Sequence, residues 1–263
     1  MDSHLPLGQN KEIPLVDLPM WKVLLYIFVP TSILTMVYVG VGQISAVQKA
    51  IPSLLLFFLL ALLILFPIEI LIVCFASKKA LGRYSLKSAF THHQKLPWWQ
   101  IALFGLLAWL FVGLMTITIA PLENMLFAPV SFGLSELLPA YFDWTNFDYL
   151  ENYSRSTLIL TAVVLFVFNG FVGPIIEELF FRGYLTAKIS RYGKYVPLII
   201  TVLFSLYHFW LPFNNLFRII AFYPAFHITW KKRNIFISII THCLSNLFST
   251  ISIILMIRTF LER

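Results

Sequence analysis

The stretch GPIIEELFFRGYL, residues 173–185, places two adjacent glutamates and an arginine at the end of one of the most apolar runs of the chain. The 263 residues are 59% hydrophobic and 12% charged. An average soluble domain is about 25% charged. These three charges are therefore surrounded by lipid and apolar side chains, and the composition predicts an all-α, polytopic transmembrane helix bundle.

Seven apolar runs are long enough to cross a bilayer, whose hydrocarbon core takes about 20 helical residues. The fourth run predicts one long helix that is longer than the lipid core is thick. The sixth run is the weakest, because Arg218 and His227 lower its hydropathy, and we expect it to be short or partly re-entrant. The predicted spans are residues 21–44, 52–77, 99–121, 156–190, 196–211, 214–230 and 235–257.

Basic residues collect between the apolar runs, in segments 78–95, 191–194 and 231–233. By the positive-inside rule these segments are expected to be cytoplasmic, and the N-terminal segment 1–20 with them. The acidic and aromatic segment 122–155 is expected outside, partly at the membrane interface. Short loops and compact size favour a bacterial plasma membrane. The basic residues do not form one face, so nucleic acid is not an expected partner.

Ionisable side chains in transmembrane helices are costly, and each is therefore a candidate functional residue. Residues four apart share a helix face, so Arg182 is expected to pair with Glu178, whereas the equivalent neighbour of Glu177 is Phe181. Glu177 is left without a local partner and becomes the candidate proton acceptor. Pro174 predicts a kink that opens space beside the glutamates. A purely structural ion-pair network remains the alternative.

Three more polar residues lie in the following apolar runs: His208, and the pair His242 and Asn246, which are four apart on one helix face. At 1.5 Å per residue, Glu177 and His208 both lie roughly 20 Å from the basic segment between them, and His242 roughly 16 Å from its own. This common depth predicts one buried pocket, reached from the cytoplasmic side. Taken singly, each residue is equally consistent with core packing or polar contacts between helices.

Glu69 and the two cysteines lie in other apolar runs. Glu69, in FPIEILIV, is expected to face lipid, with Arg218 as its suggested partner. Cys74 and Cys243 are expected to be buried thiols, and neither a disulfide nor a metal site is predicted from them.

Three short motifs resemble those of a known family. EELFFR (177–182), FSLYH (204–208) and HCLSN (242–246) fit the EExxxR, FxxxH and HxxxN motifs, in the same order and on successive helices. The chain is thus similar to the CPBP family, which includes CAAX prenyl endopeptidases and bacterial Abi membrane proteases linked to bacteriocin processing and self-immunity. The resemblance covers roughly residues 160–257, within the proposed catalytic helices 156–263; residues 21–155 supply the N-terminal helices.

The resemblance implies a metal-independent glutamate endopeptidase without a cofactor. Glu177 would activate a water molecule with the help of His208. His242 and Asn246 would stabilise the oxyanion. Glu178 and Arg182 would brace the site. The expected partners are membrane lipid and a peptide or protein substrate, membrane-anchored substrates included.

Three other functions are consistent with the same residues. One glutamate and two histidines can form a catalytic zinc site, although no HExxH motif occurs. A transporter also places ionisable residues at mid-membrane, but usually shows repeats, and none is visible here. In a non-catalytic scaffold or immunity factor the motifs would serve packing alone.

Overall fold

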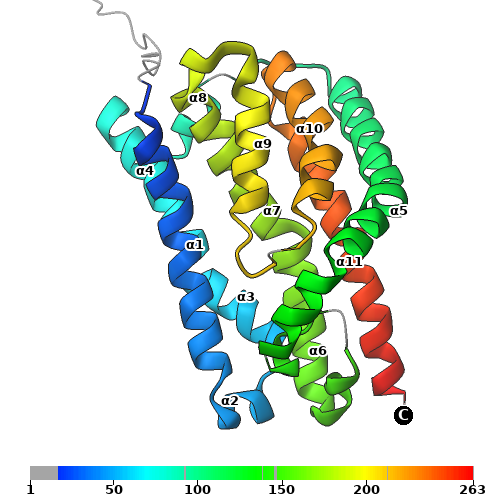
Figure 1. Cartoon of the computed structure of the whole chain (residues 1–263). Helices are drawn as coiled ribbons and strands as arrows, with labels where there is room; N and C mark the ends of the chain where they lie inside the picture. The colour runs from blue at the N-terminus through cyan, green and yellow to red at the C-terminus, as the bar shows by residue number, and fades with distance from the viewer. Residues whose placement is uncertain (1–16, 92, 138, 145–146, 212, 263) are drawn as a thin grey trace, which may run out of the picture.

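The computed structural model describes residues 17–91, 93–137, 139–144, 147–211 and 213–262 (Figure 1). The predicted N-terminal segment 1–20 lies mostly outside these ranges. Within them all regular structure is helical and no β-strand occurs, which confirms the all-α, polytopic bundle. Five helical segments are long and apolar enough to cross a membrane: Met20–Gly42, Ser53–Leu81, Trp98–Pro129, Arg155–Lys188 and Phe236–Leu261.

The fifth and sixth apolar runs form a helical hairpin that enters the bundle and turns back. α9 (Val196–Leu206) has 11 residues. At 1.5 Å per residue it is about 17 Å long, roughly half the thickness of a hydrocarbon core. α10 (Asn215–Lys232) returns to the same end, and the loop between the two helices lies near the middle of the bundle (Figure 1). A re-entrant form was predicted for the sixth run only.

The N-terminal half contributes three spans. α1 (Met20–Gly42) and the short α2 (Ser45–Ala50) lead into the second span, which is interrupted at Ile64 between α3 (Ser53–Leu63) and α4 (Leu65–Leu81). The third span, α5 (Trp98–Leu137), passes through two prolines and continues well beyond residue 121, where the predicted span ends. Part of the segment predicted as an external loop is therefore helix.

The segment that carries the two glutamates is helical from Arg155 to Lys188 but not regular. Wider π-helical turns lie on both sides of the short α-helix that contains Glu177 and Glu178, and Pro174 occupies its first turn, where proline is tolerated. One long helix was predicted here. The observed pieces are α6 (Arg155–Val164), η4 (Leu165–Val172), α7 (Gly173–Glu178), η5 (Leu179–Leu185) and α8 (Thr186–Lys188).

The two ends of the bundle differ in chemistry. At the end that carries the basic segments, Leu18 N–H donates to Lys188 O at 2.8 Å and Gln94 N–H to Arg233 O at 2.7 Å. At the opposite end, Tyr141 donates its hydroxyl hydrogen to Ile51 O at 2.8 Å. We call these the basic end and the aromatic end.

Small residues allow two close approaches between helical segments. α5 meets α11 (Phe236–Leu261) at Gly105, whose carbonyl oxygen accepts the Thr241 hydroxyl at 3.1 Å. Gly183 in η5 packs against η1 (Lys87–Phe90), where a Cβ atom would lie 2.5 Å from Ala89 O. These contacts fix α11 and the glutamate-bearing segment against the rest of the bundle.

Candidate active site

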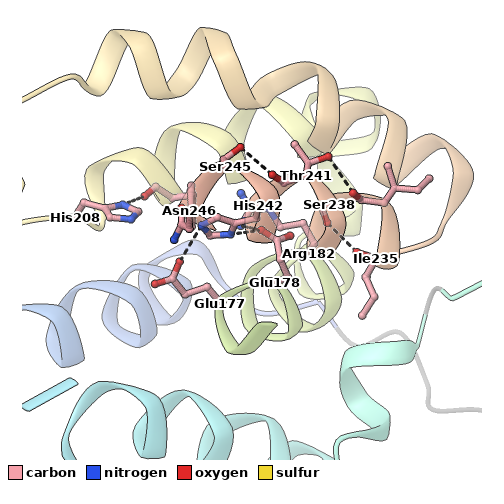
Figure 2. Close-up of polar contacts among 12 residues, drawn as sticks. Glu177, Glu178, Arg182, His208, Ile235, Ser238, Thr241, His242, Ser245 and Asn246 are labelled. Atoms are coloured by element: carbon pink, nitrogen blue, oxygen red, sulfur yellow. Dashed lines mark hydrogen bonds and ion pairs between the residues drawn. The ribbon is translucent and has the colours of Figure 1, made fainter. Parts of the chain in front are cut away.

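Glu178 is the centre of a buried ionic network. Its Oε1 lies 3.0 Å from Arg182 Nη1 and 3.0 Å from His242 Nδ1, and the glutamate is 0% exposed (Figure 2). The guanidinium carbon of Arg182 lies 3.2 Å from the ring centre of Phe226 and 4.0 Å from that of Phe204. The ion pair expected from the four-residue spacing is thus present, and two aromatic faces add cation–π contacts to it.

Glu177 has a different environment although it is the next residue. It is 8% exposed, and it makes no hydrogen bond with any residue that the structure describes. Its nearest ionic neighbour is His242, with 3.8 Å between Oε2 and Nε2, which is too long for a hydrogen bond. One glutamate is therefore paired and the other faces open space, as the helix spacing predicts.

His242 lies between the two carboxylates. A carboxylate accepts hydrogen bonds, so the contact at 3.0 Å with Glu178 makes Nδ1 the donor. Nε2 is the ring atom that remains on the side of Glu177 (Figure 2). The ring is held at edge-to-face contact with Phe204 and Phe222, which fixes its orientation.

The predicted span 196–211 places His208 inside a transmembrane helix, and the structure does not. α9 ends at Leu206, and His208 belongs to the mid-bundle loop that follows it. Its Nδ1 donates to Phe204 O at 2.8 Å, so that in the neutral ring Nε2 carries the lone pair. His208 makes no direct polar contact with Glu177 among the described residues; the two share a cavity instead.

Asn246 is anchored by a residue to which the motifs assign no role. Its Nδ2 donates to Asn169 O at 3.1 Å, and Asn169 in turn donates to Thr250 Oγ1 at 2.7 Å. Asn169 lies about two helical turns before Glu177. A polar side chain at that spacing is the signal that could have identified it.

One cavity of about 460 Å³ is lined by all four residues that the motifs single out as catalytic: Glu177, His208, His242 and Asn246. Arg218 also lines it, with guanidinium hydrogen bonds to Leu211 O at 2.7 Å and Asn215 Oδ1 at 3.1 Å. The equal depth inferred from helix rise thus corresponds to a shared space. No three His, Cys, Asp or Glu side chains in the described part of the chain are grouped so that they could hold a metal ion.

The lining of the catalytic cavity extends away from the basic end, whereas access from the cytoplasmic side was expected; the side from which the cavity is reached stays a prediction. Its lining continues from Glu177 toward the aromatic end, where it includes Leu54 and Trp144. A separate cavity of about 340 Å³ lies at the basic end and is lined by Arg182. The buried Arg182 network fills the space between the two cavities, which helix depth alone could not indicate.

Glu69 also differs from its prediction. It is 1% exposed rather than facing lipid, and its Oε1 accepts the Tyr207 hydroxyl at 2.8 Å. Arg218, the suggested partner, makes no ion pair with it. Both cysteines are free: Cys243 is buried, whereas Cys74 is partly exposed.

Helices that cross a membrane several times, with ionisable residues around an internal cavity, define a multi-pass membrane protein with an enzyme-like site. Residues 159–248 match the family model described as "Type II CAAX prenyl endopeptidase Rce1-like". This match supports the resemblance to CAAX proteases over that part of the chain and indicates a membrane protease. No curated protein and no solved structure matches the chain.

Proposed function

We propose that the protein is a metal-independent glutamate endopeptidase that hydrolyses a peptide bond within the membrane. The observation that carries this proposal is the contrast between the two glutamates. Glu178 is held by Arg182 and His242, whereas Glu177 lies at the cavity wall without a hydrogen bond among the described residues. A carboxylate held in that way is available to a water molecule in the cavity.

In the proposed reaction, Glu177 removes a proton from a water molecule whose oxygen attacks the peptide carbonyl carbon. The carbonyl oxygen becomes an oxyanion. Its donors are Nδ2–H of Asn246 and, in the doubly protonated ring, Nε2–H of His242. When the tetrahedral intermediate collapses, the C–N bond breaks and the amine takes the proton from Glu177. His208, through Nε2, helps to orient the attacking water.

Glu178 and Arg182 are proposed to position rather than to react. Glu178 fixes the His242 ring through Nδ1, so that Nε2 points at the reacting atoms. Arg182 compensates the charge of Glu178, which is fully buried. Removal of either charge would leave the other unpaired in an apolar environment.

The proposed substrates are peptides or proteins, membrane-anchored ones included, since the cavity lies within the bundle and most of its lining is apolar. Peptide or bacteriocin maturation, self-immunity and CAAX processing are all compatible with this chemistry. We place the protein in the cell membrane, with a bacterial plasma membrane favoured and the N-terminus in the cytoplasm.

The test compares peptides released in membranes that contain the wild-type protein or the Glu177→Gln variant. We expect Glu177→Gln and His208→Ala to lower cleavage by about 10²–10⁴-fold, the usual contribution of general acid–base groups. Matched controls are Glu69→Gln, whose amide oxygen can still accept from Tyr207, and His227→Ala, since His227 does not line the cavity. Both controls should retain cleavage.

Two results would contradict the proposal. One is cleavage by Glu177→Gln at the wild-type rate. The other is loss of cleavage on strong chelation that is restored by zinc, which would favour the alternative of a zinc-dependent membrane protease. A transporter or a non-catalytic immunity factor would show no Glu177-dependent peptide release at all.

A further inference from the structure

The two ends of the bundle carry opposite charge patterns. At the aromatic end the described residues include the basic Lys49, Arg155 and Arg258 and the acidic Asp143, Asp148, Glu151 and Glu262. At the basic end Asp17 is the one acid among the described residues, against Lys22, Lys78, Lys79, Arg83, Lys87, Lys95, Lys188, Arg191, Lys194, Lys231, Lys232 and Arg233. The positive-inside rule assigns the basic end to the cytoplasm.

The cavity extends away from that end. Glu177, eleven residues before Lys188, lies about 16 Å from the basic end along its helix and lines the cavity. The lining then includes Leu165 and Ile253, and reaches Trp144, whose Nε1 donates to Ser53 Oγ at 2.9 Å at the aromatic end. The space beside the glutamate therefore continues toward the non-cytoplasmic side.

The way from the cytoplasmic side is filled. Arg182 is 5% exposed and lies between Phe204 and Phe226, each 2% exposed. Arg182 lines the cavity at the basic end, whereas Glu177 and Phe204 line the catalytic cavity. An ion pair and two aromatic rings thus separate the two spaces, and a polypeptide could pass only if this buried network were broken.

The rim of the catalytic cavity is exposed where α5 and α11 line it. Phe248 is 66% exposed, and Ser249 and Thr116 are also exposed. These residues lie between the level of Glu177 and the aromatic end. An opening there is suited to an extended chain that enters from the outer half of the bilayer.

We propose that the substrate reaches Glu177 from the non-cytoplasmic side, through the rim between α5 and α11, and not past Arg182. That the entering molecule is a substrate rests on the proposed function, whereas the route itself is inferred from the charges at the two ends and from the lining of the cavity. It selects extracytoplasmic or membrane-anchored polypeptides, and it excludes a peptide presented only at the cytoplasmic surface.

The route is tested by single cysteines in a full-length background without native thiols (Cys74→Ser, Cys243→Ala). Ser245→Cys lies in the cavity, Asn152→Cys at the exposed aromatic end and Lys87→Cys at the exposed basic end. A charged, membrane-impermeant methanethiosulfonate is added outside intact cells. We expect Ser245→Cys and Asn152→Cys to react, and Lys87→Cys to react only in inverted vesicles.

Three outcomes would overturn the route: reaction of Ser245→Cys only from the side of Lys87, reaction from both sides, or reaction from neither. Reaction of Lys87→Cys from outside intact cells would overturn the orientation. Labelling does not depend on catalysis, so the same experiment on a Glu177→Gln background must give the same pattern. Failure of the proposed function would instead appear as cleavage by Glu177→Gln while the labelling pattern holds.

Discussion

Arg182 combines an ion pair and cation–π contacts at a buried position. Its charge faces Glu178 at 3.0 Å, and its flat guanidinium lies against Phe226 and Phe204. Neither contact alone offsets the free energy that is lost when a cation is removed from water. Together with His242 on the other side of Glu178, they hold one carboxylate in place, and this is why we propose its neighbour, Glu177, as the reactive one.

Arg182→Ala should therefore destabilise the fold by about 3–5 kcal/mol, because it leaves the carboxylate of Glu178 buried and unpaired. The matched control is Arg258→Ala, which removes the same four-residue pairing from Glu262 where both side chains are exposed. The control should leave the melting temperature unchanged. Thermal unfolding of the purified variants in detergent measures both. Equal melting temperatures for Arg182→Ala and Arg258→Ala would refute the bracing role.

Local spacing predicted the partners of Glu178 but not those of Glu69 or Asn246. Arg182 is four residues from Glu178, and helix geometry fixes that distance. Tyr207 is 138 positions from Glu69, and Asn169 is 77 positions from Asn246. Contacts of that separation depend on which helices become neighbours, and hydropathy does not contain this information.

At the scale of a single element, α10 begins with its N-terminal amides bonded to another helix. Glu123 on α5 accepts hydrogen bonds from the backbone N–H groups of Leu216 and Phe217, at 3.0 and 2.5 Å. A carboxylate at this position satisfies donors that have no partner within the helix and interacts well with the helix dipole. It also fixes the end of the loop that carries His208.

Glu123→Ala should lower stability by about 1–2 kcal/mol, the range measured for the loss of a helix cap. It should also slow cleavage, because Asn214 and Arg218 line the cavity beside this helix end. Glu123→Gln retains an acceptor oxygen and should keep most of both properties. Melting temperature and cleavage rate, measured on the same preparations, check this. Wild-type behaviour of Glu123→Ala would show that the cap has no role.

The packing of η5 on η1 leads to a second prediction at this scale. Gly183→Ala places a Cβ 2.5 Å from the backbone oxygen of Ala89, and overpacking of this kind costs about 1–3 kcal/mol. Gly113→Ala is the control, since nothing lies within 4 Å of its added Cβ. We expect a lower melting temperature for the first variant and no loss for the second. An unchanged melting temperature for Gly183→Ala would mean that η1 can move away from the added Cβ.

Hydropathy predicted where the apolar helices lie but not whether each one crosses the membrane. Residues 196–211 have the composition of a span, yet α9 ends at Leu206 and the chain turns back. α10 packs against α5 and α11, and α9 packs against α10 and η5, and these contacts exist only in the assembled bundle. The π-helical turns around α7 are likewise invisible to a hydrophobic pattern.

At the scale of the whole molecule, the depth of the site residues in the membrane could be predicted from the sequence, but the direction in which their cavity extends could not. Helix rise is constant, so distances from the basic segments placed Glu177, His208 and His242 at similar levels, and the three line one cavity. The side on which that cavity opens depends on where side chains fill the bundle. Arg182, Phe204 and Phe226 fill the bundle toward the basic end, and this packing supports the proposed entry from the opposite end.

The mid-bundle loop after α9 has a consequence for the bilayer itself. From Tyr207 to Leu211 the chain has left the helix, and its peptide groups need partners that lipid cannot offer. Part of this need is met inside the protein, since His208 N–H donates to Ser205 O and the Thr31 hydroxyl donates to Tyr207 O. The same turn also lines the catalytic cavity, through His208, Trp210 and Leu211. Under the proposed function, the one water molecule that each cleavage consumes would enter through the cavity that this turn lines.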